Sequence, residues 1–346
     1  MLSIKMSIRK TTPPAMPAVR LHPAGGPQQR AAVLATTAAI PDIHGHSVAL
    51  HRVVSHLNNR PVERIFLGDF FDRGYGNRAV YDILRGEKRL LMGNHAILQL
   101  LAVKGDVWGL NKWLGNGAQP FLEECGINYK PVREAEEQLR RRYTLIGNNM
   151  EDLFVQMQVD YRAVLEKLSS EIMANPVLRE ICSWLLECTK LYHIDSNGIL
   201  YIHGGVPETE IQPGLFERLD AIHRQFRDLL STPSPDLFRL RQLRTILLNF
   251  LGVRGDEFLA PIAKRGENAV SGYLRQMGVS GMVCAHTIKS KVEVTGGRVF
   301  EIDLGMSAFN QGSFVTLGPD GVKSFRETGP AGFTEQVLVT PAEWLI

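Results

Sequence analysis

The chain contains 346 residues, enough to build one large domain or two small ones around a sizeable hydrophobic core. Its formal net charge of +3 is too small to indicate a nucleic-acid or membrane partner, and no apolar run reaches the roughly 18–20 residues of a membrane span. The four cysteines are scattered and form no CxxC pair, which argues against a disulfide framework or a zinc ribbon and favours a reducing compartment such as the cytoplasm.

The N-terminal segment, residues 1–30, is rich in Pro, Ala, Gly, Lys and Arg, and no Asp or Glu precedes Asp42. The segment lacks hydrophobic periodicity, so we predict a disordered leader. An organelle transit peptide is the alternative, because such peptides are also basic and poor in acidic residues, although serine is sparse here.

Three units follow, each made of an apolar strand, a short polar motif and a helix with apolar residues at helical spacing. The expected strands are residues 31–40, 64–67 and 89–92, and the expected helices are residues 48–57, 79–84 and 96–103. The motifs between them are Pro41-Asp42-Ile43-His44-Gly45, Gly68-Asp69-Phe70-Phe71-Asp72-Arg73-Gly74 and Gly93-Asn94-His95. Strands that alternate with helices imply parallel βαβ units, whose ligands gather at the carboxyl ends of the strands. We therefore expect the three motifs to meet in one site.

The second motif, residues 68–74, places two carboxylates and a guanidinium close together in the chain. The glycines at its ends allow a tight turn or a close approach to a ligand. Asp69 could hold a metal and Arg73 an anion, whereas a solvated turn with a local ion pair is the alternative that this loop alone leaves open.

Residues 126–190 differ in character, because dense charge is combined there with apolar residues at helical spacing. We predict a helical cap or insertion over this segment. The run Arg140-Arg141-Arg142 could face an acidic substrate, but nearby glutamates favour a solvated helix face. Residues 209–250 are also predicted to be helical, with Pro233 and Pro235 as breakers.

Strand character returns at residues 198–202, which end in His203-Gly204-Gly205. Residues 282–284, 298–302 and 313–317 have strand character as well, and we assign them to a second sheet. His286 follows the first of these three strands. Residues 331–346 are predicted to be a C-terminal tail.

The polar residues at the strand ends combine carboxylate, imidazole and amide groups, which suits a pair of divalent metals such as manganese, iron or zinc. These residues are Asp42, His44, Asp69, Asp72, Arg73, Asn94, His95, His203 and His286. Two metals need one bridging carboxylate, and together they acidify a bound water into a hydroxide nucleophile. Such a pair clamps the attacking and leaving oxygens of an in-line phosphoryl displacement, so the residues indicate phosphoester hydrolysis.

The motifs PDIHG, GDFFDRG, GNH, HGG and AHT resemble the calcineurin-like metallophosphoesterase superfamily in its phosphoprotein phosphatase branch, where the usual pattern is GDxHG, GDxxDRG, GNHE, HGG and a late His. Their order and spread match over residues 35–305. The helical middle and Val253-Arg254-Gly255 further resemble the Shewanella-like phosphatases. The resemblance implies an α/β fold (α+β by some schemes) over residues 31–330, with two mixed sheets packed as a sandwich, flanking helices and a helical insertion.

The resemblance also assigns roles. Asp42 and His44 would bind the first metal, Asp69 would bridge, and the second metal would be completed by Asn94, His203 and His286. His95 would be the general acid, with Asp72 orienting the imidazole and raising its pKa. Arg73 would grip phosphate oxygens, and Asn94 and Arg254 would also contact the phosphate.

Three departures from the family pattern are visible. Pro41 stands where the family usually has Gly, Ala96 replaces the acid after His95, and Ala285-His286-Thr287 lacks the second histidine of the wider superfamily. None of them removes a ligand, so we expect activity.

Five further residues that could suggest function are interpreted as structural. His46 lies at a helix start, His193 is a hydrogen-bonded histidine, Trp108 and Trp113 pack beneath the helical segment, and Cys284 is a buried small hydrophobe.

The leading hypothesis is a metal-dependent phosphomonoesterase of the Ser/Thr protein phosphatase type, acting on a phosphorylated protein or a small phosphoester. A dinucleoside polyphosphate hydrolase is one alternative, because related enzymes share the metal motifs. A non-catalytic phosphoprotein-binding scaffold is the other, because Pro41 and Ala96 depart from the pattern.

Overall fold

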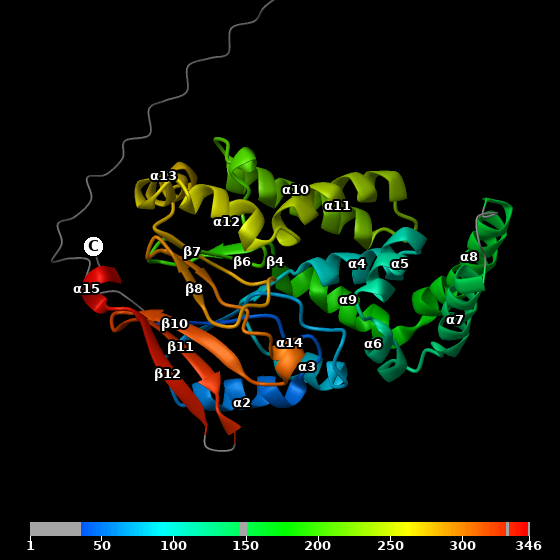
Figure 1. Cartoon of the computed structure of the whole chain (residues 1–346), viewed down its shortest axis with the longest axis horizontal. Helices are drawn as coiled ribbons and strands as arrows, with labels where there is room; N and C mark the ends of the chain where they lie inside the picture. Colours follow the sequence, from blue (N-terminus) through cyan, green and yellow to red (C-terminus); the bar gives the residue numbers. More distant parts are fainter. Residues whose placement is uncertain (1–35, 146–150, 330–331, 345–346) are drawn as a thin grey trace, which may run out of the picture. The chain divides into compact units, whose positions relative to one another are not determined.

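A computed structural model describes residues 36–145, 151–329 and 332–344 of the chain. The predicted leader, residues 1–30, lies outside the described residues. Two β-sheets form the centre of the described part, one with seven strands and one with five (Figure 1).

The first sheet is mixed, with a parallel half and an antiparallel half. Its strands, in spatial order, are β12 (Phe333–Val339), β11 (Gly321–Glu327), β10 (Ser313–Gly318), β1 (Thr37–Ile40), β2 (Glu63–Phe66), β3 (Leu90–Leu91) and β4 (Thr189–Lys190). The strands β1 to β4 run parallel, and β1 is also paired antiparallel with β10, so that Thr37 lies opposite Glu63 on one side and Leu317 on the other.

Two expectations are corrected in this sheet. Residues 313–317 belong to the first sheet rather than the second, because β10 hydrogen-bonds to β1. The segment 331–346, predicted to be a tail, contains β12, which pairs antiparallel with β11 at the sheet edge. Strand pairing rather than strand character decides sheet membership, and pairing is not visible in the sequence.

The second sheet is also mixed. Its order is β5 (Tyr192–Ile194), β6 (Ile199–Ile202), β7 (Gly281–Cys284), β9 (Val299–Glu301) and β8 (Glu293–Thr295). The three central strands β6, β7 and β9 are parallel, and the edge strands β5 and β8 are antiparallel to their neighbours.

The two sheets pack against each other through a shared apolar layer. Ala39 and Ile65 from the first sheet lie in one buried cluster with Tyr201, Val283 and Phe300 from the second. Because successive side chains alternate between the faces of a strand, the other faces are left to helices. The prediction of an α/β fold built on two mixed sheets is therefore confirmed.

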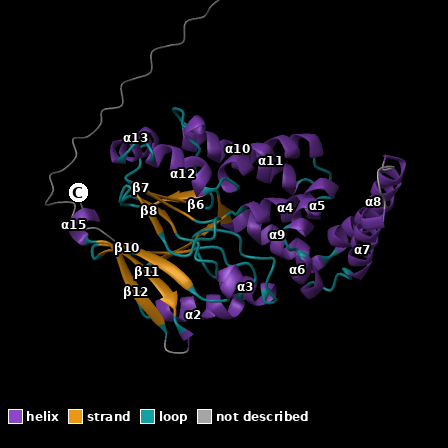
Figure 2. Ribbon diagram, viewed as in Figure 1, coloured by secondary structure: helices purple, strands orange, loops and turns teal. Residues whose placement is uncertain are grey.

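Helices flank both sheets (Figure 2). Those that follow the first three strands are α2 (Ser47–Leu57), α3 (Asn77–Leu84), α4 (Asn94–Val103), α5 (Val107–Gly115) and α6 (Gln119–Glu124). In α2 the buried residues Ala49, Leu50, Val53 and Leu57 recur at helical spacing and define its core-facing side. Helix α4 is buried on all sides over Ala96–Val103, as expected for a helix enclosed by other elements.

Three helices occupy the predicted insertion: α7 (Lys130–Leu145), α8 (Glu151–Ala174) and α9 (Pro176–Cys188). Helix α9 begins where the Asn175 side chain accepts the Leu178 N–H at 3.0 Å, and Pro176 occupies the first turn. Helix α8 packs against α4, α5, α7 and α9, which joins the insertion to the helices around the first sheet. In the run Arg140-Arg141-Arg142, the Arg141 side chain is described; it is exposed and lies 3.6 Å from Glu137, in agreement with a solvated face.

The remaining helices come after β6 in the chain. They are the 3₁₀ turn η1 (Glu208–Glu210), α10 (Leu215–Ser231), α11 (Leu237–Leu251), α12 (Gly255–Ala263), α13 (Glu267–Met277), α14 (Met306–Phe309) and α15 (Pro341–Trp344). Pro233 and Pro235 lie between α10 and α11, as predicted. Figure 1 shows α10 to α13 beside the second sheet and α2 beside β10 to β12. Among the described residues, none of the helices is both long and apolar enough to cross a membrane.

Candidate metal centre

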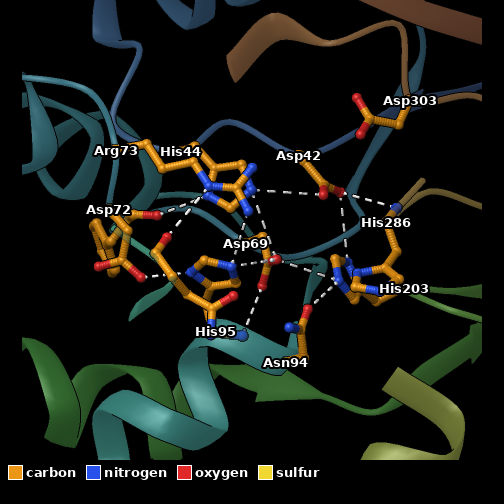
Figure 3. A network of polar contacts seen from close by, with 12 residues as sticks. Asp42, His44, Asp69, Asp72, Arg73, Asn94, His95, His203, His286 and Asp303 are labelled. Carbon is orange, nitrogen blue, oxygen red and sulfur yellow. Dashed lines mark hydrogen bonds and ion pairs between the residues drawn. The ribbon is translucent and has the colours of Figure 1, made fainter. Parts of the chain in front are cut away.

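All the predicted site residues except Arg254 lie just beyond the carboxyl ends of parallel strands from both sheets, and Figure 3 shows their side chains gathered in one network. In the first sheet, β1 leads to Asp42 and His44, β2 to Asp69, Asp72 and Arg73, and β3 to Asn94 and His95. In the second sheet, β6 leads to His203 and β7 to His286. The parallel arrangement in each sheet explains why motifs far apart in the sequence meet at one place.

Asp69 is at the centre of the cluster. Its Oδ2 lies 3.4 Å from Nε2 of His203 and 3.8 Å from Nε2 of both His44 and His95. Its Oδ1 accepts the backbone N–H of His95 at 3.0 Å. One carboxylate is thus approached by three imidazoles from three different segments of the chain.

Asp42 is the second buried carboxylate of the cluster. Its Oδ1 lies 3.6 Å from Nδ1 of His203 and accepts the backbone N–H of His286 at 3.3 Å. Its Oδ2 lies 3.8 Å from Nε2 of His44. The amide oxygen of Asn94 lies 3.0 Å from Nε2 of His203.

These side chains form two overlapping groups that could each hold a cation. The ligand atoms of Asp42, Asp69, His203 and His286 all lie within 4.8 Å of one another, and the same is true of His44, Asp69 and His95. Asp69 belongs to both groups, which is the geometry required of a bridging ligand. Carboxylate oxygens and imidazole nitrogens are suitable donors for manganese, iron or zinc, so the residues fit the metals that the sequence indicates.

The electrostatics of the two carboxylates differ. Burial raises the pKa of Asp42 well above its usual range, although His203 partly opposes the rise. Burial would also raise the pKa of Asp69, but the surrounding His203, His95 and His44 hold it well below its usual range. Buried carboxylates that repel each other are stabilised by a cation between them. Asp69 is thus kept ionised by its neighbours, whereas Asp42 needs an additional positive charge.

The histidines fall into two classes. Burial lowers the pKa of His44 well below its usual range, and burial together with the charge of His203 lowers the pKa of His286 to about 4. Both imidazoles are therefore neutral at neutral pH, as metal ligands must be. Burial would lower the pKa of His203, but Asp69 and Asp42 raise it to about 9. A cation near these carboxylates would replace the proton of His203 as their positive partner.

His95 and Asp72 form a separate pair at one side of the cluster. His95 Nδ1 lies 2.7 Å from Asp72 Oδ2, and the neighbouring Arg73 Nη2 lies 3.3 Å from His95 Nε2. Burial would lower the pKa of His95, but Asp69 and the hydrogen bond to Asp72 raise it. Since Arg73 can only donate, it faces an imidazole whose Nδ1–H donates to Asp72 and whose Nε2 is free to accept.

Trp113 is hydrogen-bonded to this pair, whereas the sequence analysis predicted only aromatic packing for it. Its indole Nε1 donates to Asp72 and lies 2.9 Å from each carboxylate oxygen. Aromatic packing is present as well, since Trp113 is buried and lies edge-on to Phe121. The residue type does not distinguish a packed indole from a hydrogen-bonded one, so no sequence signal could have revealed this contact.

The backbone at the site is held in conformations that L-residues rarely adopt. The φ angles are 48° at His44, 44° at Asp69, 81° at Asp72, 55° at Arg73 and 67° at His286. Each such residue costs roughly 1–3 kcal/mol, so surrounding bonds must maintain it. The Asp72 N–H donates to the Asn77 side chain at 2.8 Å, and the His44 N–H donates to the Asp69 carbonyl at 2.9 Å.

Gly93 shows why the motifs contain glycine. A Cβ at this position would lie 2.0 Å from Oδ1 of Asp69, well inside the contact distance. The third motif can therefore approach the second only because the glycine has no side chain. This close approach brings Asn94 and His95 to Asp69.

Asp303 is a site residue that the sequence analysis missed. It follows β9, is buried, and accepts the Gly305 N–H at 2.9 Å. Figure 3 shows it beside Asp42, whose pKa its charge raises. Burial raises the pKa of Asp303 itself to about 6. The sequence did contain a signal, since an aspartate directly follows the predicted strand 298–302.

The structure places the other named residues as follows. Arg254 is exposed at the start of α12, and its charge helps to lower the pKa of His286. His46 precedes α2, and Cys284 is fully buried, in agreement with their structural interpretation. Trp108 is exposed rather than packed beneath the helical segment, which corrects that expectation, and the Arg244 guanidinium lies 3.7 Å from its ring centroid. His193 lies within β5, where its ring stacks on Tyr201 and its Nε2 has no hydrogen-bond partner among the described residues, so the expectation of a hydrogen-bonded histidine is corrected.

Comparison with protein-family models gives one match, in which the calcineurin-like phosphoesterase model covers residues 35–290. A search among curated protein sequences found no match.

Several solved structures have a similar fold. One of a cold-active protein tyrosine phosphatase has a TM-score of 0.53 and 16% identity, with 90% of this chain and 80% of the other covered. A further structure, of a cold-active protein tyrosine phosphatase from a psychrophilic Shewanella species, has a TM-score of 0.51 and 16% identity, with 88% of this chain and 80% of the other covered. A protein serine/threonine phosphatase from Saccharomyces cerevisiae has a TM-score of 0.41 and 13% identity, with 85% and 80% covered. At these identities the two structures with TM-scores above 0.5 show a similarity of fold alone.

Proposed function

The chain belongs to the calcineurin-like phosphoesterase family, and we propose that it is a metal-dependent phosphatase that hydrolyses phosphate monoesters on serine or threonine of proteins. The observation that carries the proposal is the position of Asp69. It belongs to both candidate ligand groups, while the pair Asp72–His95 and the exposed Arg73 lie beside it. Ligand groups, a proton donor and an anion-binding side chain are thus within one cluster.

We assign the metal ligands residue by residue. Asp42, His44 and Asp69 would hold one divalent ion, and Asp69, Asn94, His203 and His286 the other, with manganese, iron or zinc as the candidates. This division differs from the geometric groups, in which Asp42 lies with His203 and His286, but Asp42 Oδ2 is also 3.8 Å from His44 Nε2. Bound ions supply Lewis-acid charge and lower the pKa of water, which provides a nucleophile at neutral pH. His95 also lies near His44 and Asp69, but its hydrogen bond to Asp72 favours proton transfer over ligation.

Arg73 is proposed to bind the phosphoryl oxygens. Its guanidinium offers several N–H donors in a plane and matches phosphate geometry. In the absence of substrate one of these nitrogens lies 3.3 Å from Nε2 of His95. When Arg73 turns to a phosphate, Nε2 is left free to carry a proton. Arg254 at the start of α12 would add a second positive charge near the same phosphate.

His95 is proposed to protonate the leaving oxygen. Its Nδ1–H remains on Asp72 while Nε2 gives a proton to the departing serine or threonine alkoxide, so the imidazolium becomes neutral. Asp69 and Asp72 raise the pKa of His95, which favours the protonated form needed at the start of this step.

A substrate panel tests the function. We expect metal-free protein, reloaded with manganese, iron or zinc, to hydrolyse phosphoserine and phosphothreonine peptides faster than diadenosine tetraphosphate. Phosphotyrosine peptides belong in the panel, because similar folds occur in cold-active protein tyrosine phosphatases. Preferred cleavage of diadenosine tetraphosphate would contradict the proposal in favour of a dinucleoside polyphosphate hydrolase. Phosphopeptide binding without phosphate release would instead favour a scaffold.

We also propose a cytoplasmic location. All four cysteines are free thiols, and burial raises the pKa of Cys125 and Cys182 to about 12. Such thiols are unreactive packing groups, which is compatible with a reducing compartment.

A further inference from the structure

Trp113 makes a polar contact that its packing role does not require. The residue lies in α5 (Val107–Gly115) and is fully buried. Its indole N–H is directed at the Asp72 carboxylate, with 2.9 Å from Nε1 to each oxygen. An indole N–H shared between both oxygens contacts the carboxylate at two points and therefore restricts its rotation.

Asp72 depends on such donors because it is fully buried. Its side chain receives the Trp113 indole on both oxygens and His95 Nδ1 on Oδ2 at 2.7 Å. A buried carboxylate that loses a donor can rotate or take up a proton to compensate. Either change would weaken its hold on His95.

The turn after α5 also holds the next residue of the motif. The backbone N–H of Arg73 donates to the Gly117 carbonyl at 2.8 Å, and its Nε donates to the Asn116 carbonyl at 3.4 Å. The end of α5 and the turn after it are therefore bonded to both Asp72 and Arg73, two of the three non-glycine residues with positive φ in this loop. Trp113 provides the contact to the side chain of the acid pair.

A second buried tryptophan provides a natural contrast. Trp184 in α9 packs against Phe71 with ring centroids 6.2 Å apart, and Phe71 stacks on Phe121, which contacts Trp113. Both indoles thus belong to the same aromatic cluster. The Nε1 of Trp184, however, has no hydrogen-bond partner among the described residues. The polar contact of Trp113 is therefore a property of its position rather than of the cluster.

We propose that Trp113 is a positioning residue for leaving-group protonation, acting through Asp72 on His95. As the ester P–O bond breaks and water supplies the new oxygen on phosphorus, His95 Nε2 passes its proton to the leaving oxygen. Trp113 holds the Asp72 carboxylate so that His95 keeps the orientation needed for this transfer. This inference rests on the proposed function.

The kinetic test compares Trp113→Phe with Trp184→Phe, because both retain an aromatic ring and only the first removes a hydrogen bond. The substrates are an aryl phosphate, whose leaving group needs little protonation, and a phosphoserine peptide, whose alkoxide needs it strongly. We expect W113F to lower kcat on the phosphoserine peptide roughly tenfold or more, with less than about threefold loss on the aryl phosphate and little change in KM. W184F should lower both rates alike. An unchanged ratio of the two rates in W113F would overturn the proposal.

A spectroscopic test does not depend on turnover. The chain has four tryptophans, so their indole N–H signals can be assigned by NMR in the wild-type protein. The Trp113 signal should exchange slowly with solvent and shift in Asp72→Asn, whereas the Trp184 signal should not shift. The His95 Nδ1–H signal should weaken in W113F and persist in W184F. A His95 signal that is unaffected in W113F would contradict the positioning role.

The kinetic and NMR measurements distinguish a failure of the proposed function from a failure of the positioning role of Trp113. If the wild-type protein hydrolyses neither ester, the proposed function fails, and the imidazole and indole signals decide on their own whether Trp113 positions His95. Thermal unfolding shows whether W113F folds. If it does not, the deciding measurement is the shift of the Trp113 indole N–H signal in the Asp72→Asn variant.

Discussion

The two sheets contribute to the site in different ways. In the first sheet, the parallel strands β1, β2 and β3 each end in a motif of several polar residues with glycines. In the second sheet, the parallel strands β6, β7 and β9 each end in one site residue, namely His203, His286 and Asp303. In both sheets the site residues follow the carboxyl ends of parallel strands, but the number of site residues at each strand end is higher in the first sheet.

The number of site residues differs between the sheets because some strand ends supply side chains for several proposed roles and others for one. The loop after β2 alone carries the central carboxylate Asp69, the proposed partner of the acid His95 in Asp72, and the proposed phosphate-binding side chain of Arg73. Several tasks in a short loop require positive φ and close backbone approach, which leave glycines and a recognisable motif. The end of β6 supplies only His203 but is followed by two glycines, and His286 after β7 also has positive φ. A strand end that supplies several side chains therefore leaves a longer sequence motif than one that supplies a single side chain.

The largest effect is expected at Asp69. Asp69→Asn removes the charge shared by both ligand groups, so we expect loss of bound metal and at least roughly a thousandfold loss of phosphatase activity. Metal content by elemental analysis and hydrolysis of an aryl phosphate measure the two losses. Asp82→Asn, on the exposed side of α3, is the matched control and should retain both. Substantial metal retention and activity in D69N would mean that the first sheet does not dominate the site.

Asp303 tests whether the second sheet contributes more than its two histidines. With a pKa of about 6 its carboxylate is ionised at neutral pH and adds negative charge beside Asp42. We expect Asp303→Asn to weaken metal affinity by roughly tenfold, measured by competition with a chelating dye. The exposed Asp320, in the turn between β10 and β11, provides the control Asp320→Asn. Equal affinities in the two variants would remove Asp303 from the site.

The smallest effect concerns the stability of the protein at low pH. A buried histidine outside the site also contributes to this pH dependence, so its contribution must be known before that of the site histidines of the two sheets can be measured. His223 in α10 is buried, its Nε2 has no partner among the described residues, and burial together with Arg227 lowers its pKa to about 4. The unfolded chain binds this proton more readily, so stability is lost as the pH falls from about 6.5 towards 4. Between about pH 7.5 and pH 5 this amounts to about 2 kcal/mol.

His223→Leu should remove that part of the pH dependence, measured by urea unfolding of the metal-free protein at the two pH values. The control His51→Leu removes an exposed histidine from α2 and should leave the pH dependence as it is. If H223L lost as much stability at low pH as the wild-type protein, the acid sensitivity would have to be sought in the site histidines themselves.

Much of the site could be predicted because most of its residues belong to short sequence motifs that directly follow predicted strands. The strand–motif–helix units were placed correctly, and the structure brings Asp42, His44, Asp69, Asp72, His95, His203 and His286 together. Features that depend on contacts between distant segments could not be predicted. The sheet that receives β10 depends on pairing with β1, and the role of Trp113 depends on which way one indole N–H points. Asp303 was within reach, because its strand was predicted and its position after the strand end matched that of the other site residues.

The pairing of β1 with β10 has a consequence for how the chain folds. Strand β1 carries the first motif, yet its antiparallel neighbour lies almost at the other end of the described chain, beyond every residue of the site. Contacts of such high sequence separation slow folding, because the closure entropy of a long loop must be met before the contacts stabilise the structure. During synthesis on the ribosome, β1 and its parallel partner β2 would be available long before β10 emerges. Until then the edge of β1 that faces β10 is open, and we expect it to need protection from pairing with another molecule.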